Sequence, residues 1–285
     1  MANRYWVGGA GDWDVSTTTH WSDSSGGAGA QSVPGSSDTA IFDAASGGGT
    51  VTPNYNLSVV SITMGAFTGT LDFSANNNSP TLATFSCNGT GTRTLKMGTG
   101  TFTLTGVSDV WIMNTVTNLT LDAGQSTIKV VGTVGLYGGK TIYANGLILN
   151  KIWYSPVEYH ANNYLRFYTS GTYSEIKLDA GTITTFLNST TTTVTTFVAL
   201  GTAESHITIS NTSLTTHATL TKAGGGVISG CDYIDIQEIT GSPADTWYIG
   251  SNSTDTGSTC TNIYLLDEPA VVATDTQQVA NNYYY

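Results

Sequence analysis

The stretch RTLKMGTGTFTL, residues 93–104, predicts the fold of this chain more directly than any other. Each half alternates apolar with polar side chains, which is the period of a half-buried β-strand. Gly98 and Gly100 lie between the halves and indicate a tight corner. Two short strands joined by such a corner form a unit that buries its inward side chains when similar units stack on it.

Comparable strand signals recur through residues 51–240, with starts roughly every 8–13 residues. The clearest are SITM (61–64), GTLDF (69–73), TLATF (81–85), TIKV (127–130), LIL (147–149), HITI (206–209) and YIDI (233–236). This spacing is typical of a sandwich, a barrel or a β-solenoid. Periodicity therefore establishes an all-β chain and leaves the architecture open.

A recurring segment favours the solenoid among these architectures. LTLDAG at residues 119–124 returns as IKLDAG at residues 176–181, each an alternating strand that ends on an Asp-Ala-Gly turn. Similar units at separate positions are expected of stacked coils, whose corners use Gly, Asn and Asp. We therefore predict a mostly parallel, β-helix-like solenoid, with an antiparallel β-sandwich as the alternative.

Composition agrees with an all-β protein and excludes some partners. The chain has 50 threonines among 285 residues, while charged residues make up only 10%. Threonine is β-branched and suits strands, and the long exposed helix that needs charged residues is not indicated. The net charge is −11 and the pI about 4.4, so binding to a phosphate backbone is not expected.

The sequence divides into four predicted parts. Residues 1–50 hold three of the six tryptophans and many glycines, and we expect an irregular, aromatic-packed N-terminal cap. Residues 51–240 form the solenoid body, and residues 241–262 form a second, Trp-containing cap. Residues 263–285 are a tail that is either disordered or held by a neighbouring subunit.

The chain shows no targeting or membrane signal. No apolar run approaches the ~20 residues of a membrane-spanning helix, and the first residues lack the apolar core of a secretory signal. We therefore expect a protein made in the host cytoplasm and released by lysis, as a virion component would be. A bacterial cell surface is the alternative location.

Residues near both ends carry a resemblance to a known family. The motifs are Tyr5-Trp6-Val7-Gly8-Gly9, Gly11-Asp12-Trp13, Thr19-His20-Trp21, Gly26-Gly27-Ala28-Gly29, Val33-Pro34, Asp38, Phe42-Asp43, Tyr233–Ile236, Thr246-Trp247-Tyr248 and Asn252–Asp255. This pattern resembles a module of β-solenoid structural proteins found in tailed phages and on some bacterial surfaces. The resemblance implies a structural or adhesive role. It does not cover the last twenty residues.

The sequence contains few residues whose spacing indicates a catalytic or metal-binding site. Asp122 and Asp179 both precede Ala-Gly and are interpreted as turn caps rather than a catalytic carboxylate pair. The three cysteines, Cys87, Cys231 and Cys260, lack zinc-site spacing. Asp12, Asp14, Asp38 and Asp43 offer a minor possibility of calcium binding. We predict no enzymatic activity and no cofactor.

Aromatic side chains provide the candidate contact residues. They are Trp153, Tyr154, Tyr159, Tyr164 and Tyr168 in the densest aromatic segment, and Tyr283, Tyr284 and Tyr285 at the end of the chain. Exposed aromatics stack on sugars or fill protein interfaces. We predict a homo-oligomer, with a trimer favoured, that contacts other virion proteins. The alternative is a receptor- or glycan-binding tail protein or adhesin, including a polysaccharide depolymerase.

Overall fold

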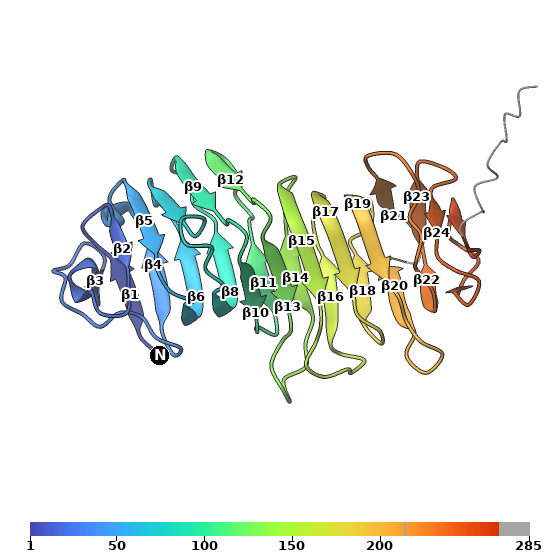
Figure 1. Ribbon diagram of the computed structural model, residues 1–285, viewed down its shortest axis with the longest axis horizontal. Helices are drawn as coiled ribbons and strands as arrows, with labels where there is room; N and C mark the ends of the chain where they lie inside the picture. Colours follow the sequence, from blue (N-terminus) through green and yellow to red (C-terminus); the bar gives the residue numbers. More distant parts are fainter. Residues whose placement is uncertain (214, 268–285) are drawn as a thin grey trace, which may run out of the picture.

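The structure is a parallel β-solenoid, which confirms the predicted fold class and excludes the sandwich. The computed structural model describes residues 1–213 and 215–267. It is nearly all β, with 46% strand and 2% helix, and its stacked coils make about 8 turns. The N-terminus lies near one end of an elongated body in which the strands run side by side along its length (Figure 1).

Each turn contributes strands to three faces. In the first turns, one strand lies on face 2, or crosses to it from face 1, and a second strand forms face 3. The short strands β1 (Asn3–Trp6) and β4 (Thr39–Phe42) lie on face 2, and the longer strands β6 (Ser58–Met64) and β8 (Thr81–Cys87) cross from face 1 to face 2. Those of face 3 are β2 (Gly11–Trp13), β5 (Thr50–Pro53), β7 (Thr70–Asp72), β9 (Arg93–Lys96) and β12 (Leu119–Asp122).

Faces 1 and 2 separate in the middle of the solenoid. β8 pairs with β10 through Leu82 and with β11 through Phe85, so the two halves of one strand lead into two different strands. The strands of this region are β10 (Thr101–Leu104) and β13 (Thr127–Val130) on face 1, and β11 (Asp109–Ile112) and β14 (Lys140–Tyr143) on face 2.

In the later turns the long strand crosses a different corner, from face 3 to face 1. These strands are β15 (Ile148–Tyr154), β17 (Gly171–Leu178) and β19 (Thr191–Ala199). Face 2 continues with β16 (Tyr164–Phe167), β18 (Ile183–Phe186), β20 (Ile207–Asn211), β22 (Ile234–Gln237) and β25 (Thr254–Asp255). The remaining strands here are β21 (Ala218–Lys222), β23 (Ile239–Ser242), β24 (Trp247–Tyr248) and β26 (Ile263–Tyr264).

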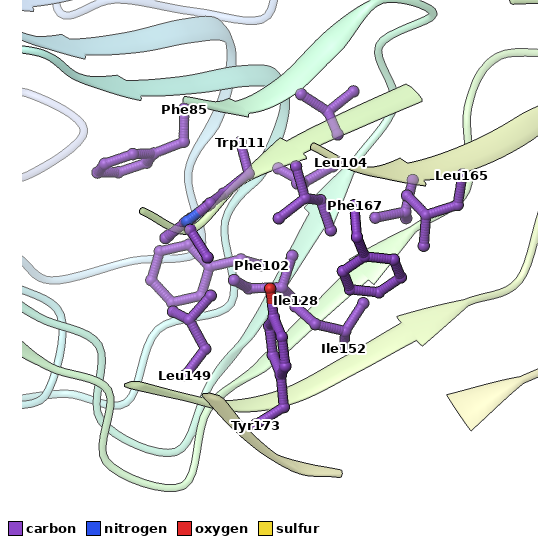
Figure 2. Close-up of a cluster of buried hydrophobic side chains, with 14 of the residues drawn as sticks. Phe85, Phe102, Leu104, Trp111, Ile128, Leu149, Ile152, Leu165, Phe167 and Tyr173 are labelled. Carbon is purple, nitrogen blue, oxygen red and sulfur yellow. The ribbon is translucent and has the colours of Figure 1, made fainter. Parts of the chain in front are cut away.

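A single apolar core fills the interior from Trp6 to Ile249. Figure 2 shows part of it, where rings and branched side chains from successive turns lie against one another. Phe85 and Trp111 stack with centroids 4.9 Å apart, and so do Phe167 and Phe186. Burial of one such side chain contributes about 1.5–3 kcal/mol, so stacking of successive turns is the main source of stability.

The N-terminal tryptophans close the first turn. Trp6, Trp13 and Trp21 are fully buried around Phe42. β3 (Trp21–Ser22) pairs antiparallel with β1 and covers its edge, and two short 3-10 helices, η1 (Thr18–His20) and η2 (Ala44–Ser46), complete the segment. Covering that edge prevents pairing with another chain.

Regular pairing extends into both regions that sequence analysis treats as irregular caps. β1 pairs parallel with β4, and β2 with β5, so residues 1–50 already contain solenoid strands. At the other end, β22 pairs parallel with β25. None of the helices in the described ranges is long and apolar enough to cross a membrane.

The two Asp-Ala-Gly segments occupy different places. Residues 119–122 form β12 at the end of the five-stranded sheet of face 3, whereas residues 176–178 belong to β17 in the large sheet. They are therefore not equivalent positions of successive turns. The recurrence pointed to the correct fold because corners of similar chemistry end strands on more than one face.

Candidate functional site

Exposed apolar side chains gather on two neighbouring loops. The loop of residues 131–139 joins β13 to β14, and the loop of residues 155–163 joins β15 to β16. Both project from the edge where faces 1 and 2 meet, beneath the green and yellow-green strands in Figure 1. We call this pair of loops the crest. Its exposed apolar residues are Val134, Leu136, Tyr137, Val157 and Tyr159, with exposed fractions from 47% for Tyr137 to 66% for Val134.

Direct contacts hold the two crest loops together. The Val157 amide donates to the Val131 carbonyl at 3.0 Å, and the Gly135 amide donates to a Glu158 carboxylate oxygen at 2.8 Å. Tyr137 stacks on the His160 ring with centroids 4.1 Å apart. The crest is therefore one unit built from two turns of the solenoid.

A tight turn shapes the tip of the first loop. Thr133 and Leu136 form an antiparallel bridge, and the Leu136 amide donates to the Thr133 carbonyl at 3.2 Å. Gly135 between them has a φ of 71°, in the left-handed region that glycine adopts without strain. The turn directs Val134 and Leu136 into solvent.

A buried lysine anchors the base of the crest. Lys140 is fully buried, and its ammonium group donates to the Gly138 carbonyl at 3.0 Å and to the side-chain oxygen of Asn163. Asn163 in turn donates to the Glu158 carbonyl, and the Tyr154 hydroxyl donates to the Asn163 carbonyl at 2.7 Å. Burial lowers the pKa of Lys140. This network ties both loops to the solenoid wall.

The predicted contact residues of the aromatic segment lie in four different places. Tyr159 belongs to the crest and is exposed. Tyr154 was wrongly predicted as a contact residue, because its side chain is fully buried and burial raises its pKa. Trp153 lies half-buried on the outer side of face 1, between two lysines. The Lys129 ammonium is 3.9 Å and the Lys177 ammonium 4.4 Å from its ring centroid.

Tyr164 and Tyr168 lie on the outer side of face 2. Tyr168 packs against Tyr143 with centroids 5.0 Å apart, and Arg166 lies over the Tyr164 ring at 5.2 Å. The Tyr143 hydroxyl lies 3.4 Å from Asp109, and burial together with this carboxylate raises its pKa. Tyr283, Tyr284 and Tyr285 lie outside the described residues.

The carboxylates considered for catalysis or calcium binding have local structural partners. Asp122 accepts the Gly124 amide at 3.1 Å, whereas Asp179 accepts the Trp153 indole N–H at 2.9 Å on a different face. In the N-terminal segment, Asp14 accepts the Thr17 hydroxyl and backbone amides, which lower its pKa to about 2. Within residues 1–213 and 215–267, no three His, Cys, Asp or Glu side chains gather as a metal site.

Two hollows lie near Ser229. One has a volume of about 380 Å³ and includes Asp232 and Asp267 in its lining, and the other, of about 340 Å³, includes Lys222. Asp232 already accepts two hydrogen bonds from Asn252, at 3.0 and 2.7 Å. Ser229 and Cys231 also line the first hollow, but the Cys231 side chain is buried, its thiol donates to the Phe197 carbonyl at 3.5 Å, and burial raises its pKa to about 11.

Sequence reasoning missed the first loop of the crest and its anchor. Val134, Leu136 and Tyr137 lie in VGTVGLYGGK, residues 131–140, where apolar residues alternate with glycines. Four glycines in ten residues exclude a regular strand, and the apolar residues between them could have indicated a projecting loop. Lys140 gave no such signal, since lysine is ordinarily exposed.

Comparisons with known proteins give no relative on which to base a function. No protein-family model matches the chain, and neither a curated protein nor a solved structure matches it. The functional argument therefore depends on the surface described above.

Proposed function

We propose that this protein is a non-enzymatic structural component of a phage particle surface, as a capsid decoration or a fibre-like element. The observation that carries the proposal is the continuous apolar core of an elongated solenoid with a projecting crest. Such a body acts as a stiff spacer because each turn is held by its neighbours. The family resemblance of both ends supports the same role.

A structural component needs partners, and we propose copies of this chain and other virion proteins. A homo-oligomer, with a trimer favoured, accounts for a soluble solenoid that carries exposed apolar side chains. Large exposed apolar patches mark interaction sites in soluble proteins. The particle surface is the proposed location, and a bacterial cell surface is the alternative.

A glycan-binding or receptor-binding role is the second candidate. Its support is the exposure of Tyr159 and Tyr168, because tyrosine rings stack on sugars. If this candidate includes depolymerase activity, two carboxylates about 5–10 Å apart must converge on the bound sugar. Asp122 and Asp179, the pair considered for that task, are bound to groups on different faces.

The test separates these candidates in two measurements. Quantitative mass spectrometry of purified particles should find many copies of the chain per particle. A chain found in the host lysate and absent from the particles would be the opposite result. Incubation of the pure protein with host capsule or lipopolysaccharide should release no reducing ends. Release of reducing ends, or absence from purified particles, would overturn the structural proposal.

A further inference from the structure

The crest is an apolar surface held in a fixed shape. Its two loops are bonded to each other through Val157 and Gly135 and to the solenoid through Lys140. Side chains that are already fixed lose little conformational entropy when a partner covers them. The cost of exposing Val134 and Leu136 to water is therefore recovered only when another surface covers the crest.

Two of the aromatic rings at or beside the crest have faces that other side chains already cover. Lys129 and Lys177 cover both sides of Trp153, and His160 covers one side of Tyr137. Aliphatic tips such as Val134 and Leu136 offer no hydrogen bonds to hydroxyl groups. These contacts favour a protein as the occupant.

Two chemically different faces meet at the crest. Face 1 carries Lys129, Lys151 and Lys177 on adjacent paired strands, which are three of the six lysines of the chain. Face 2 carries Tyr143 and Tyr168 at its outer side. We call them the lysine face and the tyrosine face. Both lead directly into the crest loops, since β13 and β15 precede these loops and β14 and β16 follow them.

Each face holds a charge that has no ionic partner within residues 1–213 and 215–267. Lys151 pairs with Glu175 at 2.6 Å, but Lys129 takes part in none of the ion pairs formed among the described residues. Asp109 on the tyrosine face also takes part in none of these ion pairs, and its carboxylate accepts a hydrogen bond from the Tyr143 hydroxyl at 3.4 Å. Arg166 is held over Tyr164 on that face.

We propose that copies of this chain pack side by side around their crests, with the lysine face of one copy against the tyrosine face of the next. The crests bury one another at the centre, and Lys129 of one copy faces Asp109 of its neighbour. Contacts between two different faces are heterologous and form a closed ring when the rotation closes. This inference names the contact surface for the proposed structural role and rests on it.

The first test compares the solution mass of matched variants by native mass spectrometry and light scattering. We expect the wild-type protein to have a multiple of the 29.8 kDa chain mass. Leu136→Asp should shift it to the monomer mass and weaken self-association at least about 100-fold, because the substitution places a charge in an apolar contact. Val15→Asp, at another exposed aliphatic residue outside the crest, should leave the oligomer unchanged.

The second test exchanges the two unpaired charges. Lys129→Glu and Asp109→Lys should each weaken the oligomer about 10-fold, and the double variant should recover most of that loss. The far-UV circular dichroism spectrum of each variant should match that of the wild-type protein. A lower mass then reports dissociation of a folded chain and not unfolding. A monomeric wild-type protein, or a Leu136→Asp variant that keeps the oligomer mass, would overturn the inference. An oligomer that forms in solution but is absent from particles would contradict only the proposed location.

Discussion

The early and late turns of the solenoid differ in the corner that the chain crosses without a loop. In the early turns β6 and β8 run directly from face 1 to face 2, and loops occur where the chain enters and leaves face 3. In the later turns β15, β17 and β19 run directly from face 3 to face 1, which leaves the corner between faces 1 and 2 to loops. The crest lies at this corner between faces 1 and 2, which no continuous strand crosses in the later turns.

The change coincides with an interruption of face 3. Its five-stranded sheet ends at β12, which pairs only with β9, while β15 begins a new run of pairs with β17. Continuous pairing on the other two faces carries the solenoid through this break. An early corner is consequently part of the core, whereas the later corner at residues 131–139 projects and exposes apolar side chains.

Arg93 provides the largest expected contrast between the two regions. It is buried at an early corner, and all its N–H groups have partners: the Cys87 sulfur and the carbonyls of Cys87, Gly91, Thr115 and Thr117. Arg93→Ala leaves these acceptors unpaired and opens a cavity. We expect a loss of at least about 3 kcal/mol in the free energy of unfolding, measured by urea denaturation.

The matched control is Arg4→Ala, since Arg4 makes exposed hydrogen bonds to Ser32 near the first turn. Its effect should be within about 0.5 kcal/mol. Equal effects of the two substitutions would show that the early corner is not part of the core.

Lys140 should behave differently because it anchors a projecting corner. Lys140→Met keeps the buried stem of the side chain and removes the donors to Gly138 and Asn163. We expect a smaller loss of about 1–3 kcal/mol, with the crest loops becoming sites of limited proteolysis while the strands persist. Proteolysis mapped by mass spectrometry gives the measurement. Cleavage spread along the whole chain would contradict a local role.

The smallest expected effect concerns Asp72, at an early corner. Burial raises its pKa, but hydrogen bonds from Ser74 and Ala75 and the nearby Lys96 outweigh burial, so the pKa is lowered. A lowered pKa means that the stabilisation is complete above the unfolded value of about 3.9 and is lost as pH falls through the folded value. Asp72→Asn should make the free energy of unfolding, measured by urea denaturation, depend less on pH in that acid range. An unchanged acid slope would show that Asp72 contributes nothing.

The sequence predicted the solenoid because alternation and Gly-containing corners are local signals. Residues 93–104 indeed give β9 and β10 with a corner between them. Which corner carries a loop depends on pairing with the next turn, and that is not local. Tyr154 illustrates the limit. In the segment WYSP, residues 153–156, it is an aromatic residue next to Trp153, but alternation along β15 turns its side chain inward. The two Asp-Ala-Gly corners were alike in sequence and still fell on different faces.

The proposal that the crest is a contact between copies is tested most directly by hydrogen exchange on the 285-residue chain. The amides of Val134, Tyr137 and Tyr159 lie on exposed loops and donate to none of the hydrogen bonds formed among the described residues, so they should exchange rapidly in a monomer. In the concentrated wild-type protein we predict slow exchange across residues 131–139 and 155–163, and rapid exchange there after dilution or in Leu136→Asp. Rapid exchange of both loops in the wild-type protein at every concentration would contradict the account.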